Sequence, residues 1–260
     1  MKSITLVIWL RKMTKFYYQI GQNCGKILIM KVFAISDLHL DTTTNKPMDI
    51  FGEEWVGYKE IFQEDWKQKV TDDDLVLLAG DLSWAMTLDD ALPDFELISS
   101  LPGQKVVIKG NHDFYWNSLT KIRNAIPQIH FIQNDCVKIG NYVICGSRLW
   151  NIPEEGSENY EQDKKIYLNE IERFKMSLNA MQKVREDGDK VIVMFHFPPF
   201  DAQYSDSPFT DLCKEYNVDK VIYGHLHGKN VRVVPCVEKD GIPYYLTSAD
   251  LVHFKLTEIF

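Results

Sequence analysis

The sequence lacks the features of a membrane-spanning or a disulfide-stapled protein. Its 260 residues contain no apolar run of about 18, the length that a membrane-spanning helix needs. It has five cysteines, and none forms a Cys-x-x-Cys pair. That spacing excludes a zinc ribbon and argues against a full disulfide framework. Free thiols in a reducing cytosol are the simplest interpretation, so we expect a cytoplasmic protein with no membrane contact.

An excess of positive charge is also missing. The chain has 29 Lys and Arg against 37 Asp and Glu, a formal net charge of −8. A protein whose main role is to bind the phosphates of nucleic acids usually carries a net positive charge. We therefore expect nucleic acid only as a substrate. The length and an apolar fraction of 45% suffice for one large core.

The first 29 residues differ from the rest because they contain basic but no acidic side chains. Their apolar stretch, residues 4–10, is short for a signal peptide, and no small-residue cleavage site follows it. An amphipathic membrane anchor would need a clearer helical periodicity. Met30, in contrast, opens a strand-like run. We therefore divide the chain into an extension, 1–29, that is not part of the fold, and one domain, 30–260.

From Met30 onward, short apolar runs alternate with longer amphipathic stretches, which is typical of an α/β fold. Runs of this length predict strands that are buried on both faces. Phe62, Trp66 and Val70 share one helical face. Pro93 suits the first turn of a helix that runs to about Leu101. Two hairpin turns are expected at 140–141 and 240–241.

Five of the apolar runs end in the same kind of residue. The runs are 32–35, 75–79, 105–109, 191–195 and 220–223. The side chains that follow them are Asp37 and His39, then Asp81, then Asn111, His112 and Asp113, then His196, and finally His225 and His227. Ligands of α/β sheets bind outside the carboxyl ends of the strands. We therefore expect these side chains to meet at one edge.

The side chains offer oxygen and imidazole nitrogen but no thiolate. That donor set suits Mn²⁺, Fe or Zn²⁺, and the imidazoles argue against Ca²⁺. There are too many donors for one ion, whereas two ions that share a carboxylate would leave positions open for water and substrate. Two metals about 3.5–4 Å apart can clamp an in-line displacement at phosphorus. Each motif alone is common, and the five together, in order, carry the interpretation.

The same motifs resemble the five sequence blocks of the calcineurin-like metallophosphoesterases. The matching blocks are Asp37-x-His39, Gly80-Asp81, Gly110-Asn111-His112-Asp113, His196 and Gly224-His225-x-His227. The resemblance covers about residues 31–250. It looks closest to a small bacterial branch of predicted phosphohydrolases, because of the stretches Lys46–Met48 and Ser83–Met86.

The resemblance implies a fold, a cofactor and a reaction. The fold would be α/β, two packed mixed β-sheets flanked by helices. The cofactor would be two divalent metal ions (Mn, Fe or Zn), and a metal-bridging hydroxide would hydrolyse the P–O bond of a phosphate ester. Asp37, His39 and His227 would hold the first metal, Asn111, His196 and His225 the second, and Asp81 would bridge them. His112 would be the catalytic histidine, with Asp113 orienting it.

The sequence leaves the substrate and the rival functions open. A small phosphorylated substrate is expected. A phosphodiesterase acting on cyclic nucleotides or nucleic acid ends is the first alternative, since the blocks do not separate it from a monoesterase. A noncatalytic binding scaffold is the second, but no block residue is lost. Arg148, Trp84 and Trp116 are candidate substrate contacts: Arg148 because its guanidinium can fork onto a phosphate, and the tryptophans because they can stack on a base or simply pack.

We expect a chain that starts at Met30 to fold and to hydrolyse substrate as well as the full chain does, because the composition changes there. Thermal denaturation and turnover of the two proteins provide the comparison. A melting temperature more than a few degrees lower for the shorter chain would show that residues 1–29 pack on the core.

Overall fold

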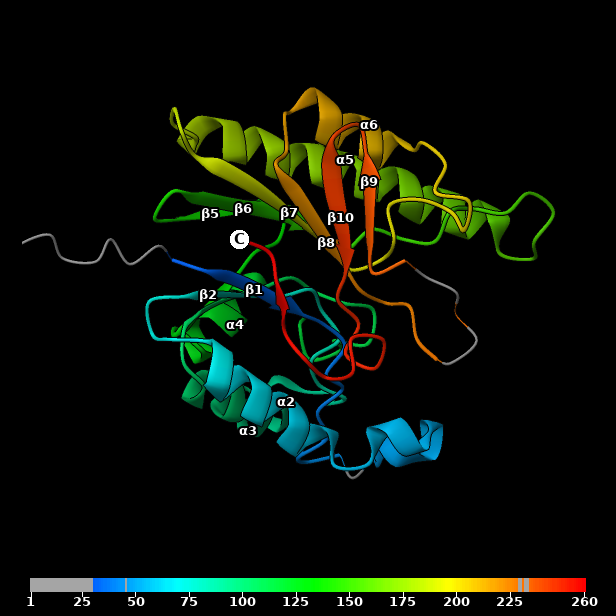
Figure 1. The fold of residues 1–260 in the computed structure, drawn as a ribbon. Helices are drawn as coiled ribbons and strands as arrows, with labels where there is room; N and C mark the ends of the chain where they lie inside the picture. Colours follow the sequence, from blue (N-terminus) through cyan, green and yellow to red (C-terminus); the bar gives the residue numbers. More distant parts are fainter. Residues whose placement is uncertain (1–29, 45, 229–230, 232–233) are drawn as a thin grey trace, which may run out of the picture. The chain divides into compact units, whose positions relative to one another are not determined.

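Two mixed β-sheets form the centre of the protein, as expected from the sequence (Figure 1). The first has the order β11-β1-β2-β3-β4, and its strands are β1 (Val32–Ile35), β2 (Leu75–Leu78), β3 (Gln104–Val107), β4 (Ile129–Phe131) and β11 (Thr257–Glu258). The second has the order β5-β6-β7-β8-β10-β9, and its strands are β5 (Cys136–Ile139), β6 (Tyr142–Ser147), β7 (Lys190–Phe195), β8 (Lys220–Tyr223), β9 (Cys236–Lys239) and β10 (Ile242–Leu246). The inner strands pair in parallel, whereas β11, β5 and β9 pair antiparallel with their neighbours.

The computed structural model describes residues 30–260 except 45, 229–230 and 232–233. The expectation that residues 1–29 form an extension lies outside these described residues. Among the helices of the described residues, none is both long enough and apolar enough to cross a membrane.

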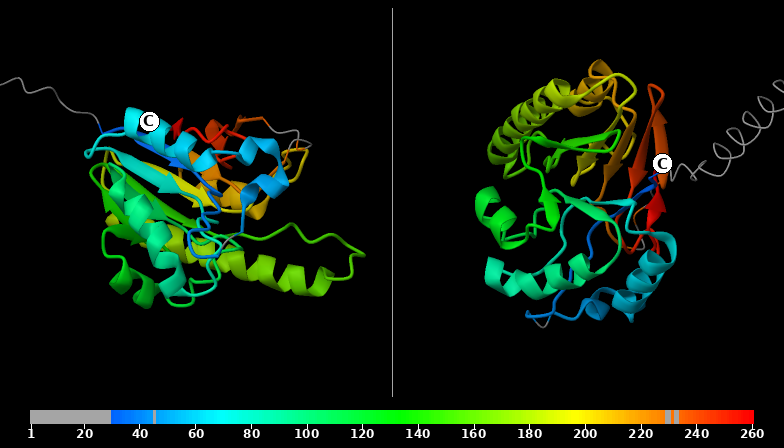
Figure 2. Two further views of the ribbon diagram at one scale, coloured as in Figure 1. Left: turned by 90° about the horizontal axis from the view of Figure 1, so that it is seen from below. Right: turned by 90° about the vertical axis from the view of Figure 1, so that its left-hand side faces the viewer.

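Helices cover the outer face of each sheet (Figures 1 and 2). The first sheet is covered by α2 (Tyr58–Lys69), α3 (Leu88–Ser100) and α4 (Leu119–Ala125). The second is covered by α5 (Tyr160–Val184) and α6 (Pro208–Glu215). Two short 3₁₀ turns, η1 (Met48–Phe51) and η2 (Glu53–Trp55), precede α2. The result is a layered α/β sandwich with the two sheets inside.

The inner strands are buried on both faces, which explains their continuous apolar runs. In β1, Phe33 and Ile35 belong to the same core cluster as Phe62 and Trp66 of α2. Successive side chains of a strand point to opposite faces, so the equally buried Val32 and Ala34 lie on the face turned away from the helices. The expected stripe on α2 and both expected hairpin turns are present.

Helix α3 begins earlier than the sequence suggests. Thr87 caps it through a hydrogen bond that its side chain accepts from the Asp90 N–H, and Asp89 and Asp90 place negative charge in the first turn. Pro93 therefore lies inside the helix and not in its first turn, which corrects the expected start. The cap and the apolar face with Ala91 and Phe95 outweigh the hydrogen bond that proline cannot donate.

The parallel strands of both sheets bring their carboxyl ends to a common edge. Ser36, just after β1, forms a bridge with Ser248, just after β10, and the Ser36 N–H donates to the Thr247 carbonyl oxygen over 2.8 Å. The two sheets are thus joined by main-chain hydrogen bonds at the point where the motif residues begin. The order and direction of the strands therefore bring the motif residues together at this edge.

We expect Phe174→Ala to lower the free energy of unfolding by about 3–5 kcal/mol, because it empties a fully buried position of α5. Its ring lies 4.8 Å from that of Phe195 in β7. Met176→Ala, on the exposed side of the same helix, should change the stability by less than about 0.5 kcal/mol. Urea denaturation measures both, and equal losses would contradict the assigned core.

Candidate metal centre

Four motif residues adopt a left-handed backbone conformation that most side chains avoid. The φ angles are 58° for Asp37, 46° for His39, 53° for Asp81 and 70° for His225. Asp and His tolerate this region better than most residues, but it still costs about 1–2 kcal/mol for each. Such strain concentrates at functional sites, where the surrounding structure enforces it.

Two positions in the motifs require glycine, because a carboxylate lies so close to the backbone that no Cβ atom would fit. A Cβ atom at Gly110 would overlap the carboxylate and the main-chain nitrogen of Asp81. One at Gly224 would overlap the Asp37 carboxylate and the Ser36 hydroxyl. The glycines of the Gly-Asn-His-Asp and Gly-His blocks therefore provide room for the two acidic side chains.

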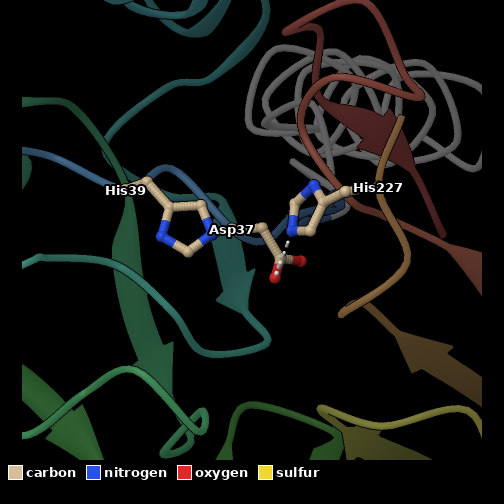
Figure 3. A group of neighbouring side chains, drawn as sticks. All are labelled: Asp37, His39 and His227. Atoms are coloured by element: carbon tan, nitrogen blue, oxygen red, sulfur yellow. Dashed lines mark hydrogen bonds and ion pairs between the residues drawn. The ribbon is translucent and has the colours of Figure 1, made fainter. Parts of the chain in front are cut away.

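Asp37, His39 and His227 form a first group of potential metal ligands, whose ligand atoms all lie within 4.8 Å of one another (Figure 3). Nε2 of His227 lies 3.2 Å from Oδ1 of Asp37. Nδ1 of His39 is buried and has no hydrogen-bond partner in the described part of the chain. The ring of His39 turns its other nitrogen, Nε2, toward Asp37 (Figure 3). One carboxylate and two imidazoles at this spacing are a donor set that fits a divalent cation, so the residues present suit the expected ion.

Asp37, Asp81 and His196 form a second group with the same close spacing. Nε2 of His196 lies 3.4 Å from Oδ2 of Asp81 and 2.7 Å from Oδ1 of Asn111. Its Nδ1 lies 2.9 Å from the Ala79 carbonyl oxygen, which fixes the ring. Asp37 is common to both groups, whereas the sequence predicts Asp81 as the shared carboxylate. The bridging role of Asp81 therefore remains a prediction.

His225 lies beside the second group but is not one of its three members. Its ring centre is 5.2 Å from that of His196 and 3.8 Å from that of Phe197. Its main-chain N–H donates to Oδ2 of Asp37 over 3.0 Å. His225 thus lies within the cluster as expected, and its role as a ligand remains a prediction.

Without a metal ion, the pKa values of the site's imidazoles divide them into two charged and two neutral rings at neutral pH. Burial acts against the charged form of His196 and His227, but Asp81 raises the pKa of His196 to about 9, and Asp37 raises the pKa of His227 to about 10. Burial lowers the pKa of His39 and of His225 to about 4. Two imidazolium ions therefore balance the two buried carboxylates at neutral pH.

Asp250 is a site residue that the sequence motifs do not reveal. Its Oδ1 lies 2.9 Å from Nδ1 of His227, and its Oδ2 accepts from the Gly228 N–H over 2.8 Å. A carboxylate behind an imidazole fixes the orientation and the tautomer of a metal ligand. Asp250 is therefore the positioning residue for His227.

Asp113 holds the main chain of the site. Its carboxylate accepts hydrogen bonds from the N–H groups of Asp81, Leu82 and Gly110, and from the Tyr115 hydroxyl. These partners join the loop after β2 to the loop after β3, and the expected orientation of the His112 ring by Asp113 stays a prediction. The His112 N–H in turn donates to Oδ1 of Asp81 over 2.7 Å.

The three expected substrate contacts lie in different environments. Trp84 lines a cavity of about 270 Å³ together with His39 and His112, and its ring stacks on that of His39 with centres 4.7 Å apart. Arg148 lies outside this cavity, with its guanidinium 4.8 Å from the Trp150 ring centre. Trp116 is only 2% exposed and packs on core residues, and its role as a substrate contact stays a prediction.

We expect the affinity for Mn²⁺ to rise from about pH 6 to about pH 8.5, because His196 and His227 must lose their protons to become ligands. Their pKa values in the metal-free protein lie near 9 and 10, so over this range metal binding releases protons. Each released proton strengthens binding by roughly tenfold per pH unit. Calorimetric titration in two buffers of different ionisation enthalpy counts the protons, and an affinity independent of pH would contradict the assignment.

The comparisons with known proteins agree with this geometry. The family model of the calcineurin-like phosphoesterases matches residues 30–229. The TT1561 protein of Thermus thermophilus is similar in fold, with 14% identity over 89% of this chain and 98% of that one, and a TM-score of 0.57. Phosphopantetheinyl hydrolase from Mycobacterium tuberculosis has 14% identity over 88% of this chain and 95% of that one, and a TM-score of 0.54. The search of the curated proteins gave no match. The chain belongs to the calcineurin-like phosphoesterase family.

Proposed function

We propose that this protein hydrolyses the P–O bond of a phosphate ester with the help of two divalent metal ions. One observation carries the proposal: two groups of acidic and imidazole side chains lie side by side, and the buried Asp37 and Asp81 have carboxylate oxygens within 4.8 Å of each other where the groups meet. Carboxylates at such a junction hold two cations close together, as a reaction at phosphorus requires. Family membership favours the same chemistry.

Each ion has its own set of residues in this proposal. Asp37, His39 and His227 hold the first ion, and Asn111, His196 and His225 hold the second, with Asp81 between them. Bound ions of this kind supply Lewis-acid charge for the phosphoryl oxygens and a nucleophile at neutral pH. No thiolate competes in the set, which agrees with Mn, Fe or Zn as the metal.

His112 is the proposed proton donor to the leaving group. Its side chain lines the cavity over the first group of ligands, with its ring centre 4.7 Å from that of Trp84. Its main chain is fixed by the hydrogen bond to Asp81, so the ring is carried by the same loop that approaches the second ion. An imidazole in this position can protonate an alkoxide as it departs.

The cavity wall gives the proposed reaction a partly dry environment. Met48, Trp55 and Trp84 line it together with the imidazoles, and Met48 and Trp55 are almost fully buried. Low polarity around a charged site strengthens the interactions that hold a phosphoryl group. These side chains come from η1, η2 and the loop after β2, so their contribution is to shape the site and exclude water.

Metal removal tests the proposal directly. Excess chelator should abolish hydrolysis of p-nitrophenyl phosphate, and Mn²⁺ should restore it. Asp81→Asn should lose metal and activity together, because the change removes a buried charge that both ions use. The matched control is Asp240→Asn, which makes the same change at a residue of similar φ, 53°, in the distant turn between β9 and β10. Full activity of protein shown to be metal-free would refute the proposal.

A second prediction concerns the leaving group. His112→Asn should slow an alkyl phosphoester by roughly 10²–10⁴-fold, the usual contribution of general acid–base catalysis. The same change should slow the p-nitrophenyl ester clearly less, because p-nitrophenolate hardly needs a proton. Both metals should remain bound, since the proposed ligands are intact.

The control for this variant is His130→Asn, which changes an exposed histidine of β4 outside both ligand groups. It should leave both rates unchanged. Equal loss factors for the two esters in His112→Asn would show that His112 stabilises charge on the phosphoryl group and does not donate the proton.

A further inference from the structure

A second cavity, of about 280 Å³, lies beside the metal centre and has no part in the function proposed so far. Its polar lining includes Lys109, Gln133, Asn134, Arg148, Glu170 and Arg173. Three cationic side chains thus face one carboxylate. In a chain with a net charge of −8, such a concentration of positive charge in a concave site is informative.

Glu170 cannot neutralise the three cations. It is 1% exposed and already accepts hydrogen bonds from the Ser147 hydroxyl and the Leu149 N–H. Nη1 of Arg173 lies 2.5 Å from it, and Nη2 of Arg148 lies 3.6 Å from it. One negative charge is therefore divided between two guanidinium groups, and the cavity keeps an excess of positive charge.

The cavity also contains a hydrogen-bond donor without a protein acceptor among the described residues. Nε of Arg148 is buried and has no hydrogen-bond partner in the described part of the chain. Nζ of Lys109 donates to the Trp116 carbonyl oxygen over 2.7 Å, which is a neutral partner. Like charges that crowd together in a cavity favour an anion between them.

The cavity is adjacent to the half of the site that contains Asn111 and His196. Lys109 precedes Asn111 by two residues, so their Cα atoms lie within about 7.6 Å. The Arg148 carbonyl oxygen accepts from the N–H of Phe197, the residue after His196, over 3.0 Å. Both basic residues follow strands of the common edge, β3 and β6, so the cavity lies at the same edge as the ligand groups.

We propose that this cavity binds a second phosphoryl group of the substrate, and that the enzyme acts on molecules that carry two phosphoryl groups. Guanidinium groups match phosphate oxygens in pairs, and a lysine adds a point charge. The choice of a second phosphoryl group as substrate feature rests on the proposed phosphoesterase function. Binding of phosphate in the cavity does not depend on that function.

The binding arm uses metal-free protein and inorganic phosphate, measured by calorimetric titration. Arg173→Gln should weaken binding by about tenfold or more, as expected for a lost hydrogen bond to a charged group. The matched control is Lys175→Gln, which removes one positive charge from the same helix at a residue paired with Glu172 outside the cavity. Absence of binding in the unaltered protein, or equal affinity in Arg173→Gln, would overturn the proposal.

The kinetic arm compares adenosine 5′-monophosphate with adenosine 3′,5′-bisphosphate in the manganese-loaded protein. Arg173→Gln should lower kcat/KM by about tenfold for the bisphosphate and by less than about twofold for the monophosphate. Equal losses would overturn the subsite. If the unaltered protein hydrolyses neither compound nor p-nitrophenyl phosphate, the proposed function fails, and the binding arm still decides on the cavity.

A folding defect is separated from a binding defect by a second variant. Arg173 is largely exposed, so we expect Arg173→Gln to fold, and thermal denaturation checks it. Arg173→Lys keeps the charge but loses the fork, and it should show a smaller loss in the same direction. A loss in Arg173→Lys that is smaller than that in Arg173→Gln, at unchanged melting temperature, supports a phosphate held by both the charge and the fork. No loss in either variant overturns the subsite.

Discussion

The burial of one carboxylate, that of Asp37, constrains the whole edge at which the two sheets meet. Its oxygens contact the ring of His227, the N–H of His225 and the hydroxyl of Ser36, which come from segments nearly 190 residues apart in the chain. A buried negative charge needs such partners because water cannot reach it. The sheet order, the bridge after β1 and the glycine at position 224 all serve to bring these partners within reach.

The α/β class, the strands and the gathering of the motif residues could be predicted because they follow from local patterns, whereas the two packed sheets were expected from the family resemblance alone. Apolar runs such as those of β1 and β8 define strands, and a polar residue directly after a parallel strand must lie at its carboxyl end. Contacts decided in three dimensions could not be predicted. Asp250 acts on His227 from 23 positions along the chain, and no motif connects them. Trp116 follows the Asn111–Asp113 block, yet the turn held by Asp113 directs it into the core.

Charge at the site is balanced in two different ways. The ligand groups pair each buried carboxylate with an imidazole that takes up a proton when no metal is bound, so protons and metal ions compete for the same place. The neighbouring basic cavity has no comparable partner, because its one carboxylate, Glu170, is shared by two guanidinium groups. Under the two proposals, the edge offers a cation-binding half and an anion-binding half, as a phosphorylated substrate would require.

The left-handed conformations of Asp37, His39, Asp81 and His225 also bear on how this protein could change over time. At such positions glycine and asparagine are the least strained residues, and both are poorer metal ligands than the residues present. Selection for thermal stability of the metal-free chain alone would therefore erode these four positions first. The proposed metal ions would supply the opposing requirement, so retention of these four residues through mutational drift would record continued use of the site.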